Sequence, residues 1–477
     1  MKNKLIQDPV VHTHLVSSLC RRDFEQFVRY AWKYVCPDQM IWELPQEVIS
    51  VHLQYFSHLT GSNTLTISVP PTSSKSLLSS VLYPAWVWTS DPTHSFICAT
   101  HTSALTQRFA TKFRDLIESD WYQQHFPNVQ LTQDTNAKLA MRTTAQGERL
   151  GISVGGSITG SHANTHIIDD LVDASDAYSI PTIEAANDWY DRVLSTRWKD
   201  NNNTSSIVIA QRLHIDDIIG HLSKLPNVIQ LSLPATMEST PCKTPVWTDQ
   251  RATGELLAPV RLPAATIAIR KISLGSNAYA AQYQQTPVPM SGGMVKPEWL
   301  ANTYDFLPKF TKVSIIADCA NTGLDDPTGI LIVGQYQAQL YVLDYVGECM
   351  TFPSLLKNIA DLRNKYSPHE ICIEAASSGH AAIQTLRQYI SSVIDLKPNG
   401  SKFERLSAAT PSLEAGSVLF PMSAPWLAEF RNEIISFPHT KHDEAVDCLS
   451  YAVNRYLMDG PTYHEILSGW AKAASMM

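Results

Sequence analysis

The order in which strand patterns and helix patterns follow one another is the feature that most constrains this 477-residue chain. Between residues 64 and 233, short apolar runs alternate with longer stretches whose apolar residues repeat at helical spacing. Strands that alternate with helices build a parallel α/β sheet. The expected strands are 64–69, 95–99, 166–168, 206–210 and 228–233, and the expected helices are 73–88, 102–119, 182–198 and 215–224.

The order changes in the second half of the chain. Three strand patterns at 313–317, 329–334 and 339–345 follow one another with only turns between them. After them come a helix at 353–365, a strand at 370–374, a helix at 379–390, a strand at 393–396 and a last helix from about 442 to 457. Three antiparallel strands followed by alternating helices and strands are typical of an RNase H-like domain.

Two such orders in one chain of this length predict two domains. The expected parts are a helical N-terminal segment (1–60), an α/β domain (61–245), a lid or connection (246–305), an RNase H-like domain (306–459) and a tail (460–477). The connection is rich in Pro, Thr, Gly and Ala, with only short helical pieces such as 278–285.

Composition limits the function classes. With 44% hydrophobic and 17% charged residues the chain is globular, and the net charge of −8 gives no global signal for nucleic acid. Any contact with DNA must therefore use a local groove. We find no signal peptide and no apolar run long enough to span a bilayer, which predicts a cytosolic protein. The eight scattered cysteines lack metal-site spacing, so reduced thiols are expected.

A phosphate-binding loop is predicted between the strand 64–69 and the helix 73–88. Backbone N–H groups and a helix N-terminus would point at the anion there. Lys75 would reach the β- and γ-phosphates, the Ser76 hydroxyl would bind Mg²⁺, and Thr72, Ser73 and Ser74 would complete the loop. Thr72 and Ser74 stand where glycines are usual, so a plain helix start capped by Thr72 or Ser73 is the alternative.

Two acids follow the strand 166–168. Asp169 suits the Mg²⁺ ligand of a Walker B strand, and Asp170 stands where an acid that polarises the attacking water is expected. A simple surface turn after a strand is the alternative interpretation.

Further acids end strands in the second half. Asp318 ends the first strand, Glu374 ends the fourth, and Asp443 opens the last helix with Asp447 one turn later on the same face. Two-metal hydrolysis of a phosphodiester needs several carboxylates that converge on hard cations. The sequence thus predicts an Mg²⁺ or Mn²⁺ site formed by these four acids, and leaves open which of Asp443 and Asp447 is the main ligand. Taken singly, each acid could instead be a helix cap or a surface charge, and Glu444 is expected to be solvated.

The first half resembles the ATPase of tailed-phage terminase large subunits. The resemblance rests on the loop Pro-Pro-x-x-x-Lys-Ser (70–76) and on further motifs at 84–88, 118–122, 153–156, 159–160, 211–214 and 278–285. The second half resembles the nuclease of the same family through Ile-Glu-x-x-x-Ser-Gly at 373–379, Lys402, Arg405, Gly416, Val418, 420–421, 437–438 and 442–447. The resemblance covers roughly residues 40–457.

The resemblance implies a P-loop ATPase domain of the ASCE type followed by an RNase H/RuvC-like nuclease domain. It implies ATP and Mg²⁺, or Mn²⁺, as cofactors, with Gln211 in the motif that couples hydrolysis to movement. Arg149 is a candidate arginine finger acting on a neighbouring subunit, or else a structural arginine. Lys402 and Arg405 are expected to contact DNA phosphates, with a solvated position as the alternative.

The implied function is ATP-driven packing of double-stranded DNA into a prohead, with metal-dependent cutting of concatemeric DNA. The expected partners are the portal, a small terminase subunit and further copies of the chain in a ring. In solution the chain is expected to be monomeric, and its expected location is the host cytoplasm.

The sequence departs from the family in two places and leaves two rivals. Ala375 and Ala376 replace an Asp-Lys pair that relatives often carry, and Asn321 stands near a usual basic residue. The glycine-poor loop favours an RNase H-like nuclease or recombinase with a vestigial nucleotide domain. A capsid-docking scaffold with a decayed ATPase is the non-enzymatic rival.

Overall fold

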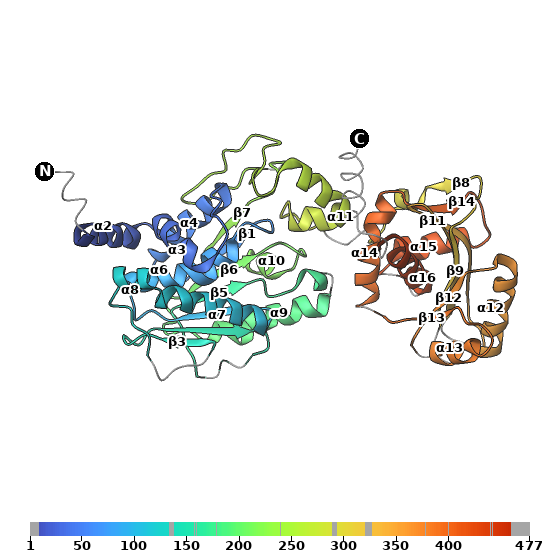
Figure 1. Ribbon diagram of the computed structural model, residues 1–477, viewed down its shortest axis with the longest axis horizontal. Coiled ribbons are helices and arrows are strands. Elements are labelled where there is room, and N and C mark those ends of the chain that lie inside the picture. The colour runs from blue at the N-terminus through green and yellow to red at the C-terminus, as the bar shows by residue number, and fades with distance from the viewer. Residues whose placement is uncertain are drawn as a thin grey trace. The chain divides into compact units, whose positions relative to one another are not determined.

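The computed structural model divides into two compact units, each described by itself (Figure 1). The first unit comprises Met1–Lys271 and Asn277–Val288, and the second comprises Ile272–Ser276 and Pro289–Met477. The structure describes residues 9–132, 138–156, 158, 160–177, 179–238, 240–288, 293–319, 327–376, 378–398, 400–438, 440 and 442–458. Thr159, Asn321 and the expected tail 460–477 lie outside the described residues. The expected connection 246–305 is shared between the two units.

The first unit begins with three helices, as predicted: α2 (Pro9–Arg22), α3 (Phe24–Val35) and α4 (Leu44–Ser57). Asp23 caps α3 by accepting a hydrogen bond from the N–H of Gln26. The apolar residues of α3 at helical spacing are buried, and Phe24 packs on Trp86 with ring centroids 5.2 Å apart. This amphipathic pattern fixes the helices against the sheet that follows.

A seven-stranded sheet forms the centre of the first unit, in the order β3-β4-β2-β5-β6-β1-β7. Its strands are β1 (Asn63–Ser68), β2 (Phe96–Thr100), β3 (Ala140–Arg142), β4 (Glu148–Ser153), β5 (Thr165–Asp169), β6 (Ser205–Ala210) and β7 (Val228–Ser232). All pairs are parallel except the one between β3 and β4. The predicted parallel sheet is confirmed, and β6 lies between β1 and β5, as in ASCE-type ATPases.

Helices cover both faces of this sheet. The expected helix 73–88 is α5 (Lys75–Leu77), the π-helical η1 (Leu78–Leu82) and α6 (Tyr83–Ser90) in succession. The remaining elements are α7 (Ser103–Glu118), α8 (Asp120–His125), η2 (Ala174–Asp176), α9 (Ile180–Arg192), η3 (Leu194–Thr196), α10 (Ile218–Leu222) and α11 (Ala264–Gln282). Ile67 packs into one core with α3 and α7, whereas Val208 packs into a second core with α9 and α10. Burial on both faces explains the almost continuous apolar runs of the strands.

The second unit has a sheet of the RNase H-like order, as predicted. Its strands are β8 (Thr303–Tyr304), β9 (Lys312–Asp318), β10 (Thr328–Tyr336), β11 (Gln339–Glu348), β12 (Glu370–Glu374), β13 (Val393–Leu396) and β14 (Val418–Pro421). Their spatial order is β13-β12-β9-β10-β11-β14-β8. β10 is antiparallel to both of its neighbours, β9 and β11, and β12 joins β9 in parallel.

Helices pack on both faces of the second sheet as well. They are η4 (Pro297–Leu300), α12 (Phe352–Tyr366), α13 (Gly379–Arg387), α14 (Lys402–Glu414), α15 (Leu427–Ser436), α16 (Glu444–Val453) and the π-helical η5 (Asn454–Met458). α12 and α13 share one core with the sheet, and α14, α15 and α16 share the other.

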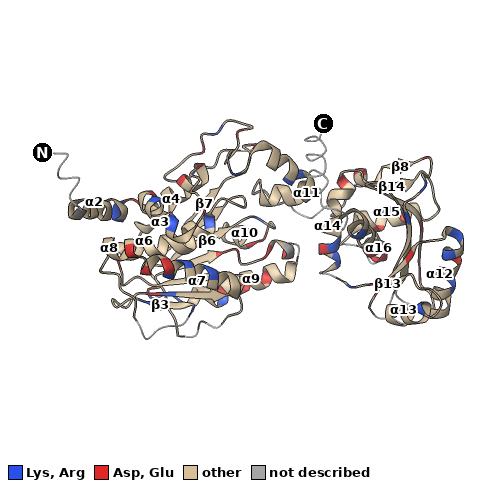
Figure 2. Ribbon diagram, in the orientation of Figure 1, with Lys and Arg blue, Asp and Glu red and all other residues tan. Residues whose placement is uncertain are grey.

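Other features agree with the composition. Basic and acidic residues are interspersed over both units (Figure 2). All eight cysteines are free thiols, as predicted. Among the helices of the described residues, none is long and apolar enough to span a bilayer.

Candidate functional site

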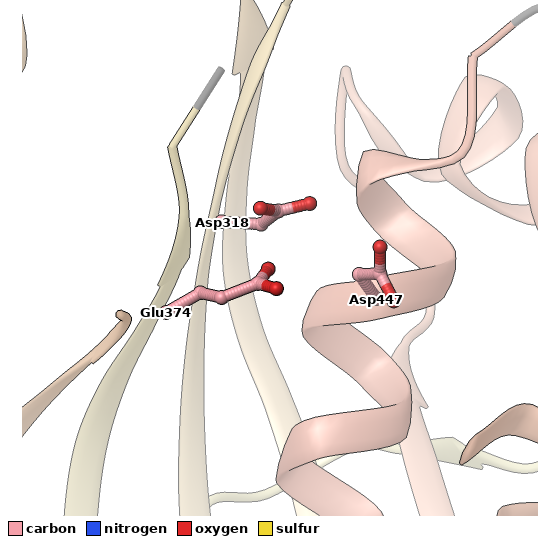
Figure 3. Close-up of side chains that lie close together, drawn as sticks. All are labelled: Asp318, Glu374 and Asp447. Atoms are coloured by element: carbon pink, nitrogen blue, oxygen red, sulfur yellow. The ribbon is translucent and has the colours of Figure 1, made fainter. Parts of the chain in front are cut away.

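Three carboxylates of the second unit converge, as Figure 3 shows. One oxygen from each of Asp318, Glu374 and Asp447 lies within 4.8 Å of the others. Asp318 is the last residue of β9 and Glu374 the last of β12, and these strands are parallel neighbours. The two acids therefore lie at one edge of the sheet, and α16 brings Asp447 to the same place.

Close packing of α16 on the sheet positions Asp447. Gly329 of β10 pairs with Asp318, and a Cβ atom there would lie 3.0 Å from Cys448 Sγ and 3.0 Å from Glu444 Cβ. A side chain at this position would make the helix move away by a few tenths of an ångström, so glycine favours the close packing. At the start of α16, the Glu433 carboxylate accepts a hydrogen bond of 2.6 Å from the N–H of Ala445. This contact caps the helix from outside.

The cluster has an excess of negative charge. Burial raises the pKa of Asp318 to about 9, helped by its hydrogen bond with Glu374 and by the charges of Asp447 and Glu374. Lys402 Nζ lies 2.7 Å from Asp447 Oδ2, and the Arg405 guanidinium also pairs with Asp447. Converging carboxylate oxygens around an acid that holds its proton fit a hard divalent cation, which would replace that proton.

The structure brings together Asp318, Glu374 and Asp447 but not Asp443. Asp443 precedes α16, and its Oδ1 atom lies 2.6 Å from Lys402 Nζ. The Asp443 carboxylate thus lies outside the group of three in this structure, and its predicted ligand role stays a prediction. The expectation of a solvated Glu444 is also wrong, since this residue is only 7% exposed.

A second group of polar residues lies at the carboxyl edge of the sheet in the first unit, where ligands of open α/β sheets bind. Ser76 Oγ donates a hydrogen bond of 2.9 Å to Asp169 Oδ1, and Lys75 Nζ lies 3.6 Å from Asp170 Oδ2. The loop after β1 and the two acids after β5 thus meet, although they are far apart in sequence.

The loop at residues 70–76 contains no glycine, yet its backbone adopts conformations that glycine usually provides. Thr72 and Ser74 have φ values of 70° and 58°, in the left-handed region that side chains disfavour. Hydrogen bonds hold it: Ser73 Oγ donates to the Pro70 carbonyl (2.7 Å), and the buried Gln46 side chain donates to the Ser73 carbonyl (2.9 Å). Gln46 was not predicted, because a contact 27 residues away leaves no local pattern.

Asp169 is buried behind the loop. Burial and the charge of Asp170 raise the pKa of Asp169 to about 7, against the lowering effects of Lys75 and of the Ser76 and Ser80 hydroxyls. Ser80 Oγ donates to Asp169 Oδ2 at 3.3 Å. Ser80 was also missed, although its position one helical turn after Ser76 is a usable signal.

Asp170 and Gln211 are neighbours. The main-chain N–H of Gln211 donates to Asp170 Oδ1 at 3.2 Å. Gln211 directly follows β6, the strand beside β5, which puts its main chain beside the acids, and its predicted coupling role stays a prediction.

Arg149 does not fit the predicted arginine finger. Its side chain is among the largest that are fully buried, its Nη2 atom donates to the Ser80 carbonyl at 2.8 Å, and its guanidinium lies 4.9 Å from the ring centroid of Phe113. Burial lowers the pKa of Arg149. Acting on a neighbouring subunit needs an exposed guanidinium, so this role is withdrawn in favour of the structural alternative.

Fold and sites together define a class of protein, an ASCE-type P-loop ATPase fold joined to an RNase H-like fold with an acidic cluster. Residues 315–456 match the family model of the terminase RNase H-like domain. These residues belong to that domain family.

Solved structures extend the likeness to most of the chain. The large terminase of a thermophilic bacteriophage in complex with ADP has 13% identity and a TM-score of 0.51, covering 87% of this chain and 100% of that one. The same phage's large terminase in complex with ATP-γ-S has 12% identity and a TM-score of 0.52, covering 87% and 99%. The large terminase of bacteriophage HK97 has 10% identity and a TM-score of 0.36, covering 91% of this chain and 99% of that one. This TM-score is too low to support a conclusion. No curated protein matches. The family match covers one domain, and the solved structures show that most of the chain shares the fold of large terminases.

Proposed function

We propose that this protein is a DNA-packaging motor and nuclease. Its first unit hydrolyses ATP to move double-stranded DNA into a prohead, and its second unit cuts concatemeric DNA. The observation that carries the proposal is that one chain with the large-terminase fold has both a Lys75–Ser76 loop facing two acids and a separate three-carboxylate cluster.

In the ATPase, Lys75 binds the β- and γ-phosphates, and the loop from Thr72 to Ser76 surrounds them with main-chain N–H groups. Ser76 and Asp169 hold Mg²⁺, which when bound offsets charge on the phosphate oxygens. Asp170 orients the attacking water. Large terminase from the thermophilic phage has been solved in complex with ADP and with ATP-γ-S, which supports nucleotide binding by a chain of this fold.

In the nuclease, Asp318, Glu374 and Asp447 hold one or two divalent cations. Such a cation supplies Lewis acidity and a more acidic water. Lys402 and Arg405, which lie against Asp447, contact the phosphate backbone of the DNA once a cation offsets the charge of Asp447.

We also propose its partners and its location in the cell. The motor acts as a ring of copies on the portal, receives DNA from a small terminase subunit and works in the host cytoplasm. Gln211, whose main-chain N–H donates a hydrogen bond to Asp170, couples ATP hydrolysis to DNA movement.

Two substitutions separate the activities. Lys75→Ala should abolish ATP hydrolysis, and Asp318→Ala should stop plasmid cleavage with Mg²⁺ or Mn²⁺ while ATP hydrolysis continues. Purified portal or proheads plus DNA should stimulate the ATPase. If DNA with portal or proheads does not stimulate the ATPase, the motor function is refuted and a nuclease with a vestigial ATPase is favoured. If Asp318→Ala still cleaves plasmid DNA, the proposed nuclease site is refuted.

A further inference from the structure

The backbone of Asp170 is strained. Its φ is 45°, in the left-handed region that a residue with a side chain seldom adopts unless its neighbours enforce it. The main-chain N–H of Asp170 donates to the Ile209 carbonyl at 2.9 Å. On the side-chain end, its carboxylate faces Gln211 and Lys75. The orientation of this carboxylate therefore depends on how firmly its own peptide is held.

The strongest hold on the Asp170 carbonyl comes from His101. This residue directly follows β2, the other neighbour of β5. Its main-chain N–H donates to the Asp170 carbonyl at 3.2 Å, and its ring Nδ1 lies 2.9 Å from the same oxygen. Because a carbonyl oxygen only accepts hydrogen bonds, Nδ1 carries a hydrogen here. On the other side of the ring, Nε2 lies 3.4 Å from Asp173 Oδ2.

The ring contact exceeds what burial of the carbonyl requires. One main-chain hydrogen bond already satisfies the Asp170 oxygen, and the imidazole adds a second bond in a different direction. Two donors from different directions restrict the rotation of the peptide more than one donor does. Asp173 orients the ring from the far side, so the turn from Asp170 to Asp173 is tied to the end of β2 at two points.

We propose that His101 is a positioning residue for ATP hydrolysis. Its imidazole clamps the carbonyl of Asp170 and thereby keeps the strained residue turned so that the carboxylate faces Lys75 and the γ-phosphate position. The inference rests on the proposed ATPase function and adds to it a residue that acts through the backbone of the catalytic acid, without touching nucleotide or metal.

A pair of substitutions isolates the Nδ1 contact. An asparagine amide has its nitrogen near the position of Nδ1, whereas a glutamine amide nitrogen reaches the position of Nε2. His101→Gln should therefore lose the bond to Asp170, and His101→Asn should keep it. His125→Gln is a matched control, because His125 Nδ1 lies 2.8 Å from the Trp121 carbonyl on α8, away from the acids. Should His101→Gln not fold, His101→Ser removes the same bond.

The assays use the full chain. In His101→Gln the DNA-stimulated kcat should fall by about tenfold, as for one lost hydrogen bond, with KM for ATP and the Kd of a fluorescent ADP analogue with Mg²⁺ unchanged. Without nucleotide, hydrogen exchange of the amides at 169–171 should rise in this variant only. His101→Asn and His125→Gln should match the wild type in kcat and in exchange.

The outcomes are distinguishable. Wild-type kcat and exchange in His101→Gln would overturn the inference, and so would an equal loss in His101→Asn or in His125→Gln. If the wild type does not hydrolyse ATP, or if Lys75→Ala hydrolyses it as fast, the proposed function fails and the inference fails with it.

Discussion

Glu370 joins the three elements that carry the acidic cluster, at the end of the strands away from it. It is the first residue of β12, whose last residue is Glu374. Its carboxylate lies 2.8 Å from Lys312 Nζ, at the start of β9, and 3.0 Å from Arg455 Nε in η5, which continues α16. The Tyr456 hydroxyl donates to it as well. Glu370→Gln keeps the shape of the side chain and removes its charge.

The expected loss of unfolding free energy in Glu370→Gln follows from the pKa of Glu370. Burial alone would raise it, but hydrogen bonds from Arg455, Lys312 and Tyr456 outweigh burial and lower the pKa from 4.5 to about 2. That difference corresponds to about 3 kcal/mol of unfolding free energy. The Glu370 side chain is only 8% exposed, but Lys312 and Arg455 are 35% and 30% exposed, so solvent screening makes this value an upper bound. Loss of one partner from a buried ion pair costs a similar roughly 3–5 kcal/mol.

Urea unfolding of the full chain, resolved by hydrogen exchange in β9 and β12, measures the loss at pH 7. Because the folded-state pKa is lowered, the stabilisation is present above about pH 4.5 and disappears as the pH falls towards 2. The gap between wild type and Glu370→Gln should therefore narrow below pH 4.5. Asp395→Asn is the control, since it breaks an exposed pair with Arg387 and should change nothing measurable. A loss under about 1 kcal/mol at pH 7, or a gap that does not change with pH, would refute the reasoning.

Three further predictions concern the cluster. Asp447→Asn should weaken Mn²⁺ binding by at least about tenfold in calorimetric titration, as loss of a ligand does, and Asp443→Asn should weaken it far less; equal losses would return Asp443 to the site. Because the pKa of Asp318 is raised to about 9, binding displaces a proton, so Mn²⁺ affinity should rise by up to about tenfold per pH unit between about pH 6 and 8. In Asp318→Asn the Mn²⁺ affinity should no longer rise with pH in this way. A wild-type Mn²⁺ affinity that does not change with pH would contradict the prediction. Gly329→Ala should lower the unfolding free energy by about 1–3 kcal/mol and weaken Mn²⁺ binding, because the new methyl displaces α16; unchanged urea unfolding would show that the helix adapts.

Much of the site was predictable because it depends on strand ends. Asp318 and Glu374 each follow an apolar run, and parallel neighbours place their carboxyl ends at one edge. The same rule brought Asp169 to the loop containing Lys75. Apolar runs and the succession of strands and helices along the chain are properties of short segments, so they can be recognised in a single sequence.

What could not be predicted depends on contacts between distant segments. The same-face rule allowed both Asp443 and Asp447, and the structure brings Asp447 rather than Asp443 into the group with Asp318 and Glu374. Arg149 is polar in sequence but buried in β4, because Ser80 and Phe113 surround it. The elements that were not predicted include β3, β4, β8, β14, α8, α14 and α15, and α11 was expected only in part. Its helical pattern is interrupted at Gly275, where φ is 72°.

The two raised pKa values explain why net charge is a poor guide to the function of this chain. Asp169 titrates near pH 7 and Asp318 near pH 9 because each acid is buried beside other acids, with too few positive groups to balance them. Such clusters oppose folding at neutral pH unless a proton or a cation neutralises them. A divalent cation that binds only the folded clusters must therefore stabilise both units. The net charge of −8 counts these acids as though they were exposed to solvent. With cations bound, the edge of the second sheet that contains Lys402 and Arg405 would be much less negative, as an approaching DNA phosphate requires.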